Sequence, residues 1–161
     1  MFALACGSGL RVSEICALRI QDIDSKQMRV FVRNNKRDKD RHTILSQQCL
    51  EFLRDYWRSF RPKYPEGLLF PKWRNITSIT EKIINDALRK RLRAVDISRN
   101  VSIHSLRHAF AAHLLEDGTG IFTIKELLGH SSISSTTVYL HLTNTGANLI
   151  SPADRPHSNG R

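Results

Sequence analysis

The spacing of the apolar residues is the feature of this sequence that most constrains its fold. Leu50, Leu53 and Trp57 recur at intervals of three and four residues, which places them on one face of a helix. Residues 79–92 keep the same period through isoleucine, alanine and leucine, and residues 104–115 also favour a helix. Polar residues, prolines and glycines separate these segments. The chain is therefore expected to fold mainly from amphipathic helices.

Capping residues indicate where the helices begin and end. Small polar side chains accept hydrogen bonds from the first N–H groups of a helix, and glycine favours its end. Helix starts are expected at Ser13, Ser46, Ser78 or Thr80, Thr123 and Ser134, and helix ends at Gly118 and Gly129. Thr123 is expected to form a capping box with Glu126.

Two further segments have the alternation of strands. Residues 28–33 and 41–45 alternate loosely in polarity, and the polar residues 34–40 lie between them, which predicts an antiparallel hairpin. A short additional strand is expected at residues 68–70. The predicted fold class is α+β, mainly α-helical with a small antiparallel β-sheet.

The charge of the chain is uneven. Its 25 Lys and Arg residues exceed its 15 Asp and Glu residues, giving +10, and such an excess favours a polyanionic partner. Residues 26–42 and residues 67–100 each carry +5. These two basic segments would form one groove if the fold brings them together; the alternative is two solvated surfaces.

Three cysteines, Cys6, Cys16 and Cys49, are odd in number and widely spaced. Neither a disulfide framework nor a metal site fits this spacing, so reduced core residues are expected. The start of the chain lacks the pattern of a signal peptide, and no apolar stretch approaches the ~18 residues of a membrane span. We therefore expect a cytoplasmic protein without membrane contacts.

Five residues in three segments are candidates for chemistry. Arg11 follows a glycine turn at the expected start of a helix, where backbone N–H groups favour an anion. His104 and Arg107 share a helical face, and His130 precedes Tyr139 by nine residues. Each residue taken alone is more often structural. Together they favour phosphate, because arginine offers a planar bidentate fork to phosphate oxygens.

The three segments together resemble the tyrosine recombinase (phage integrase) family. Residues 9–14 (GLRVSE) resemble its first arginine motif, and residues 104–115 (HSLRHAFAAHLL) its second. Residues 127–139 (LLGHSSISSTTVY) resemble the segment that holds its last histidine and its tyrosine nucleophile. The order and spacing agree over about residues 3–142. The resemblance implies a catalytic domain of that fold over residues 1–142. Residues 143–161 are polar, with two prolines and no strong period, so a flexible tail is expected there.

The resemblance also implies a role for each residue. Arg11 and Arg107 would hold the non-bridging oxygens of the scissile phosphate and oppose the charge that develops in the transition state. His104 and His130 would complete the phosphate site, with His104 assisting the proton of the tyrosine. Tyr139 would attack phosphorus and form a 3′-phosphotyrosyl bond.

Lys36 matches the lysine that this family carries in a turn between two strands, with Lys39 as the alternative. No metal and no cofactor are implied. The implied partner is double-stranded DNA in the bacterial cytoplasm, bound at the nucleoid, with a homo-oligomer on DNA left open. The expected contacts to the DNA backbone are Arg33, Arg37, Lys39, Arg41, Arg89, Lys90 and Arg93.

Two other functions compete with strand transfer by an integrase of a mobile genetic element. Family members begin with a separate DNA-clamping domain that is absent from this sequence, so a non-catalytic DNA-binding remnant or regulator is one alternative. A metal-dependent hydrolase that uses His104, His108 and His113 is disfavoured. The helix lacks the Glu of an HExxH site, and nine residues separate the outer two histidines.

Overall fold

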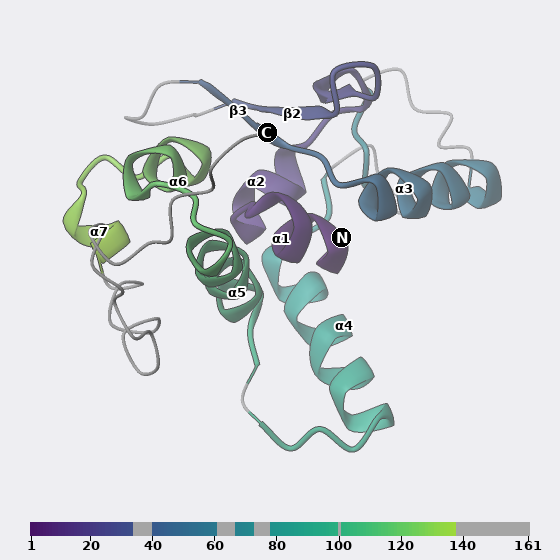
Figure 1. Ribbon diagram of the computed structural model, residues 1–161. Helices are drawn as coiled ribbons and strands as arrows, with labels where there is room; N and C mark the ends of the chain where they lie inside the picture. Colours follow the sequence, from purple (N-terminus) through teal and green to yellow (C-terminus); the bar gives the residue numbers. More distant parts are fainter. Residues whose placement is uncertain (34–39, 61–66, 73–77, 100, 138–161) are drawn as a thin grey trace, which may run out of the picture.

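The computed structural model describes residues 1–33, 40–60, 67–72, 78–99 and 101–137, and in that part the predicted mixture of helices and a small sheet is confirmed. The helices are α1 (Phe2–Ser8), α2 (Val12–Ala17), α3 (Gln47–Phe60), α4 (Glu81–Ala94), α5 (Ile103–Glu116), α6 (Ile121–Leu128) and α7 (Ser134–Thr137), with a 3-10 turn at Ile20–Asp22. The strands are β1 (Ile23–Asp24), β2 (Arg29–Val32) and β3 (Arg41–Ile44). Figure 1 shows α1 near the middle of the molecule, with the sheet, α3, α4 and α5 around it.

Several helix boundaries follow from local capping, as expected. Ser46 precedes α3, and its Oγ accepts a hydrogen bond from the backbone N–H of Cys49 at 3.2 Å. Thr80 is the N-cap residue of α4, as expected from its position, but its side chain accepts no hydrogen bond from the helix start. Gly129, at φ 64°, follows the last residue of α6, in a left-handed conformation that glycine adopts without strain.

The expected starts at Ser13 and Thr123 are wrong. Arg11 is the N-cap residue of α2, and its backbone N–H donates to the Glu14 carboxylate at 2.7 Å. The side chain that pairs with the N–H at the helix start thus comes from the first turn of the helix itself. Ser13 is not needed as a cap and lies inside the helix. In α6 the N-cap residue is Gly120. The backbone N–H of Ile124 donates to the carbonyl oxygen of Gly120 at 3.1 Å, so the helix begins upstream of the expected capping box.

The three strands form one antiparallel sheet in the order β1-β2-β3. β2 and β3 form the predicted hairpin, with Val30 opposite Thr43 and Val32 opposite Arg41. Directly paired residues point to the same face, and all four are buried. The expected strand at residues 68–70 is absent from the described structure, where Leu68 makes only an isolated bridge to Arg19.

Two apolar clusters make up the core. The larger gathers side chains from α1, α2, α3, α4 and the sheet, including the fully buried Leu4, Ile15 and Ile84. The smaller joins α5 to α6 through Phe110, Ala111, Ile124 and Leu128. Cys16 and Cys49 are buried, and burial raises the pKa of each thiol to about 11.

Cys6 corrects the expectation that all three cysteines lie in the core, because its side chain is exposed. Successive residues of a helix point about 100° apart, and the buried face of α1 is formed by Leu4, Ala5 and Ser8. Cys6 therefore points away from the core.

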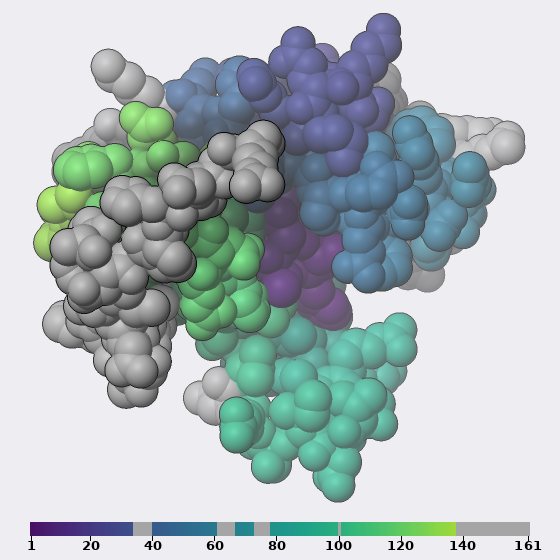
Figure 2. Space-filling model, viewed as in Figure 1, coloured from purple at the N-terminus to yellow at the C-terminus, as the bar shows by residue number. Residues whose placement is uncertain are grey.

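The described parts of the two basic segments lie apart. Figure 1 shows β2 and β3 at one end of the view and α4 at the other, with α1 and α2 between them, so these parts do not form one continuous patch. Figure 2 shows α1 recessed between α3 and α4. Among the described residues, none of the helices has the length and apolar character needed to cross a membrane.

Candidate active site

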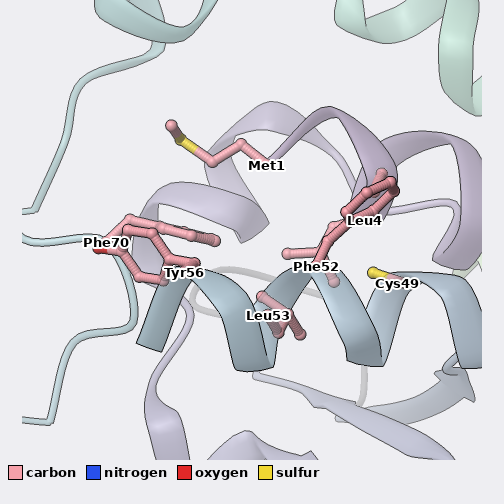
Figure 3. Close-up of a pocket in the computed structure, with 8 residues that line it drawn as sticks. Met1, Leu4, Cys49, Phe52, Leu53, Tyr56 and Phe70 are labelled. Atoms are coloured by element: carbon pink, nitrogen blue, oxygen red, sulfur yellow. The ribbon is translucent and has the colours of Figure 1, made fainter. Parts of the chain in front are cut away.

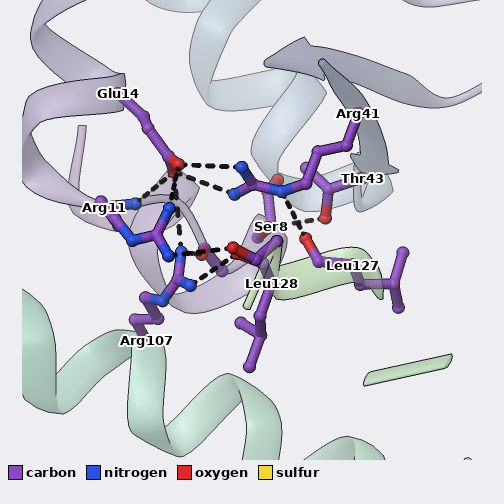
Figure 4. Close-up of polar contacts among 10 residues, drawn as sticks. Ser8, Arg11, Glu14, Arg41, Thr43, Arg107, Leu127 and Leu128 are labelled. Carbon is purple, nitrogen blue, oxygen red and sulfur yellow. Dashed lines mark hydrogen bonds and ion pairs between the residues drawn. The ribbon is translucent and has the colours of Figure 1, made fainter. Parts of the chain in front are cut away.

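Three arginines from separate parts of the sequence meet around the carboxylate of Glu14 (Figure 4). Arg11, just before α2, donates from its backbone N–H to Oε2 at 2.7 Å and from Nη1 to Oε1 at 3.0 Å. Its Nη2 also donates to the carbonyl oxygen of Gly129 at 3.1 Å. The Arg11 side chain is 34% exposed. It is thus held in the cluster while keeping access to solvent.

Arg41, the first residue of β3, forms the most complete ion pair of the cluster. Its Nη1 and Nη2 donate to the two oxygens of Glu14 at 2.9 and 3.0 Å, in a bidentate arrangement. Its Nε donates to the carbonyl oxygen of Leu127 at 2.9 Å. The Arg41 side chain is 8% exposed. This one residue therefore ties β3 to both α2 and the end of α6.

Arg107, in the second turn of α5, is the most buried of the three, with a side chain only 2% exposed. Its Nη1 donates to the carbonyl oxygen of Gly9 at 2.7 Å, and its Nη2 to that of Leu128 at 2.6 Å. Its Nη1 also lies 3.6 Å from Oε2 of Glu14. Arg107 therefore brings together the turn before α2 and the end of α6.

The charge of Glu14 is maintained by this arrangement. Burial raises the pKa of its carboxyl group, but the hydrogen bond and charge of Arg41 lower it, as do the backbone N–H of Arg11 and the charge of Arg107. The net pKa lies below its ordinary value. Three guanidinium charges against one carboxylate leave a positive cluster, which suits an anion.

Two glycines allow the chain to approach the cluster closely. Gly9 (φ 66°) would place an added Cβ 2.5 Å from the Phe110 ring. Gly129 (φ 64°) would place one 2.7 Å from Nη1 of Arg41. Both the left-handed backbone and the close contacts therefore require glycine.

His130 lies beside this cluster. Burial, followed by the charges of Arg107, Arg11 and Arg41 and by His108, lowers the pKa of His130 to about 4. The ring is therefore neutral near pH 7. Its Nδ1 lies 2.9 Å from Oγ1 of Thr136.

His104 is exposed on the first turn of α5, as expected for a side chain available to a ligand. Its ring contacts that of His108, one turn later, edge to face with a centroid distance of 4.2 Å. Burial, the neighbouring His104 and Arg107 lower the pKa of His108. Among the residues with described positions, no group of three His, Cys, Asp or Glu side chains could hold a metal ion. His113 lies against Glu116 instead, at 3.2 Å.

The structure thus brings together Arg11, Arg107 and His130, three of the six expected catalytic residues, with His104 on the same helix as Arg107. Four expected site residues lie outside the described residues: Lys36, Arg37, Lys39 and Tyr139.

The remaining expected DNA contacts divide into two groups. On α4, Arg89, Lys90 and Arg93 are exposed and line, with Asp86, an open hollow of about 430 Å³. Arg33 instead forms an ion pair with the buried Asp22 at 2.6 Å. Its guanidinium also lies over the Phe31 ring.

Arg41 corrects an expectation. It was expected to contact the DNA backbone, but its guanidinium is buried and bound to Glu14 and Leu127. Glu14, which the motifs alone did not single out, accepts hydrogen bonds from Arg41 as well as from Arg11. The alternation of β3 was the available signal, because Arg41 and Thr43 share one face of the strand.

An apolar pocket of about 90 Å³ lies between α1 and α3, away from the cluster (Figure 3). Its lining includes Leu4, Phe52, Tyr56 and Phe70. Because it contains no cationic side chain, it is not a candidate phosphate site.

Comparison with known proteins identifies relatives of this chain. The sequence profile of the phage integrase family matches residues 1–145. A protein of Sinorhizobium fredii that carries the name integrase/recombinase y4eF is 46% identical over 135 residues, covering 84% of this chain and 53% of that protein. The tyrosine recombinase XerC of Halalkalibacterium halodurans is 36% identical over 151 residues, covering 89% of this chain and 49% of the relative.

Solved structures show the same fold. The XerA recombinase superposes with a TM-score of 0.80 at 31% identity, covering 88% of this chain and 52% of that one. The XerH site-specific recombinase, in a post-cleavage complex with palindromic difH substrate, gives a TM-score of 0.76 at 25% identity, covering 88% and 41%. The chain spans about half the length of the curated relatives it matches.

Proposed function

The chain belongs to the phage integrase family of tyrosine recombinases, and from this membership we propose that it cleaves and rejoins double-stranded DNA through a 3′-phosphotyrosyl intermediate on Tyr139. The observation that carries the proposal is the cluster of Arg11, Arg107 and His130. These residues come from three distant segments and meet beside one buried carboxylate. Such an arrangement suits a phosphodiester whose negative charge increases in the transition state.

The proposed reaction exchanges one phosphate ester for another. The Tyr139 oxygen attacks phosphorus, the bond to the 5′-oxygen breaks, and the phosphate remains bound to the tyrosine. Arg11, the most exposed guanidinium of the cluster, binds a non-bridging oxygen together with Arg107. His130 donates a hydrogen bond, and His104 assists removal of the tyrosine proton. Attack by a 5′-hydroxyl reverses the step and rejoins the strand.

The leaving 5′-oxygen needs a proton, and we assign its donation to Lys36. General acid assistance is typically worth ~10²–10⁴-fold in rate. Lys36→Ala should therefore slow cleavage of ordinary DNA by about that factor. A substrate with sulfur in place of the bridging 5′-oxygen should be cut at nearly the wild-type rate, since sulfur leaves without a proton. Equal slowing on both substrates would exclude Lys36 and direct the same test to Lys39.

Double-stranded DNA is the proposed partner. The support is the charge of +10, the exposed basic residues of α4 and the DNA substrate bound by the XerH relative. The proposed backbone contacts are Arg89, Lys90 and Arg93, together with Arg37 and Lys39.

A nicked suicide substrate tests the proposal directly. Cleavage next to the nick releases a short strand and traps the protein on DNA, so wild-type protein should give a covalent adduct that resists denaturation. Tyr139→Phe should give none while binding DNA as tightly as the wild type, because only the nucleophilic oxygen is lost.

An adduct that persists in the Tyr139→Phe protein would overturn the assignment of the nucleophile. Duplex binding by wild-type protein without any adduct would favour the second candidate, a non-catalytic DNA-binding protein derived from an integrase.

A further inference from the structure

The hydroxyl of Thr136 makes a contact that the motif analysis did not assign to any function. Thr136 lies on the short helix α7, and its side chain is fully buried, with 0% exposed. Its Oγ1 lies 2.9 Å from Nδ1 of His130. The contact links α7, which precedes Tyr139 by two residues, to the arginine cluster.

Burial favours the Thr136 hydroxyl as the donor of this hydrogen bond. A neutral imidazole has one N–H donor and one acceptor nitrogen, whereas a hydroxyl can both donate and accept. Among the residues described by the structure, His130 Nδ1 is the sole partner of the Thr136 hydroxyl. If Nδ1 carried the ring hydrogen, the buried hydroxyl hydrogen would have no acceptor, which is costly. This cost favours a hydroxyl that donates to Nδ1 and a ring hydrogen on Nε2.

The tautomer of His130 matters because a neutral imidazole carries only one N–H hydrogen, on either Nδ1 or Nε2. Burial and the neighbouring Arg107, Arg11, Arg41 and His108 lower the pKa of His130 to about 4, so the neutral form prevails near pH 7. A neutral ring can donate to a phosphate only from the nitrogen that carries its hydrogen.

We propose that Thr136 is the positioning residue of His130: its hydroxyl holds the imidazole in the Nε2–H tautomer, ready to donate to the scissile phosphate. The tautomer is a property of the protein alone, while the part played by phosphate rests on the proposed function. The same hydrogen bond ties α7 to the residue that follows the Gly129 turn at the end of α6.

The tautomer is measured by long-range ¹H–¹⁵N NMR of the full chain labelled at histidine nitrogens, with His130 assigned by substitution. In wild-type protein near pH 7, Nδ1 should resonate as an acceptor nitrogen and Nε2 as a protonated one. Thr136→Val keeps the shape but removes the hydroxyl, so the two signals should move toward each other as both tautomers become populated. Thr136→Ser should restore the wild-type pattern.

Thr137→Val is the matched control, because it removes the neighbouring hydroxyl of α7, which donates to the Ser134 carbonyl oxygen at 3.0 Å. It should leave the His130 signals unchanged. A hydrogen on Nδ1 in wild-type protein would overturn the proposal without any variant. An unchanged tautomer in Thr136→Val would overturn it as well.

Cleavage of the suicide substrate provides the functional readout. Loss of one hydrogen bond predicts that Thr136→Val forms adduct roughly tenfold more slowly, with Thr136→Ser and Thr137→Val near the wild-type rate. Wild-type protein that forms no adduct would count against the proposed function and leave the tautomer measurement intact. A Thr136→Val protein of mixed tautomer but unchanged cleavage rate would overturn the role of Thr136 in catalysis.

Discussion

Arg41 shows how a single residue can be assigned by charge to one role and by burial to another. It lies in a basic segment, yet its guanidinium binds both oxygens of Glu14 inside the protein. Glu14 also accepts a hydrogen bond from Arg11 and lies near Arg107. Arg41 therefore sets the position of the carboxylate that orients the other two arginines. Its effect on catalysis is therefore expected to act through Glu14 rather than through direct contact with DNA.

Replacing Arg41 should destabilise the protein. Removal of one partner of a buried ion pair typically costs about 3–5 kcal/mol, because the other charge is left uncompensated. Arg41→Met should lower the free energy of unfolding in urea by about that amount. Arg58→Met breaks an exposed pair with Asp55 and should cost less than about 1 kcal/mol. Weaker DNA binding by Arg41→Met at unchanged stability would instead support a direct contact.

At the scale of elements, α4 is the basic surface that we propose for DNA. It is amphipathic, with Ile84 and Leu88 buried against the core, while Lys90 and Arg93 are exposed on the hollow that it forms. Arg89 lies there too, but at 3.2 Å from Asp86, which partly offsets its charge. Lys90 and Arg93 are therefore expected to contribute most to binding.

Salt dependence measures how many phosphates α4 contacts. Each phosphate contact adds about one to the slope of log binding constant against log salt concentration. The double variant Lys90→Gln/Arg93→Gln should therefore reduce the magnitude of that slope by about two. Binding to a DNA duplex is measured by fluorescence anisotropy at several salt concentrations. The control, Arg54→Gln/Arg58→Gln, removes the same charge from the exposed face of α3. Equal slopes for the two variants would show that net charge alone, rather than α4, drives binding.

At the scale of the whole molecule, the cluster joins the two parts of the core. Glu14 lies on α2, whose Ile15 and Cys16 belong to the larger apolar cluster, and Arg107 lies on α5, which contributes Phe110 and Ala111 to the smaller one. Arg107 bridges them through the carbonyl oxygens of Gly9 and Leu128. Protonation near this junction therefore affects the stability of the entire fold.

Acidification should destabilise the protein before its carboxylates titrate. The pKa of His130 falls from an ordinary 6.5 to about 4 on folding, and that of His108 also falls. Between these pH values the unfolded chain binds more protons, so stability decreases as the pH falls. The lowered pKa of Glu14 adds a loss only at more acidic pH, as the carboxylate protonates.

The melting temperature at pH 8 and pH 5 tests this effect. Wild-type protein should melt a few degrees lower at pH 5, and the difference should shrink in His130→Asn, with the pH 8 value of each protein as its reference. An equal decrease in both proteins would assign the acid sensitivity to other groups.

Local spacing predicted most of the elements. The helices α3, α4 and α5 and the β2–β3 hairpin follow from periodicity, while the two-residue strand β1 is too short to leave a pattern. The error at Ser13 arose because the Glu14 side chain accepts from the backbone N–H of Arg11, and the error at Thr123 because the backbone hydrogen bonds of α6 begin at Gly120. Arg11, Arg107 and His130 were predicted as one site, since family motifs preserve their order and spacing.

The sequence by itself determined which residues could carry the chemistry and which segments form helices and strands, because both depend on neighbours within a few positions. Only the tertiary structure decided that the Arg41 side chain is buried and that Glu14 accepts hydrogen bonds from both Arg41 and Arg11. It also decided that the Thr136 hydroxyl contacts the His130 ring. Arg41 and Glu14 are 27 residues apart, and the alternation of β3 groups Arg41 with Thr43 without recording which face of the strand another element will cover. Packing of α6 against β3 determines which face of β3 is buried. The buried guanidinium of Arg41 is stable there because a carboxylate and a carbonyl oxygen pair with it.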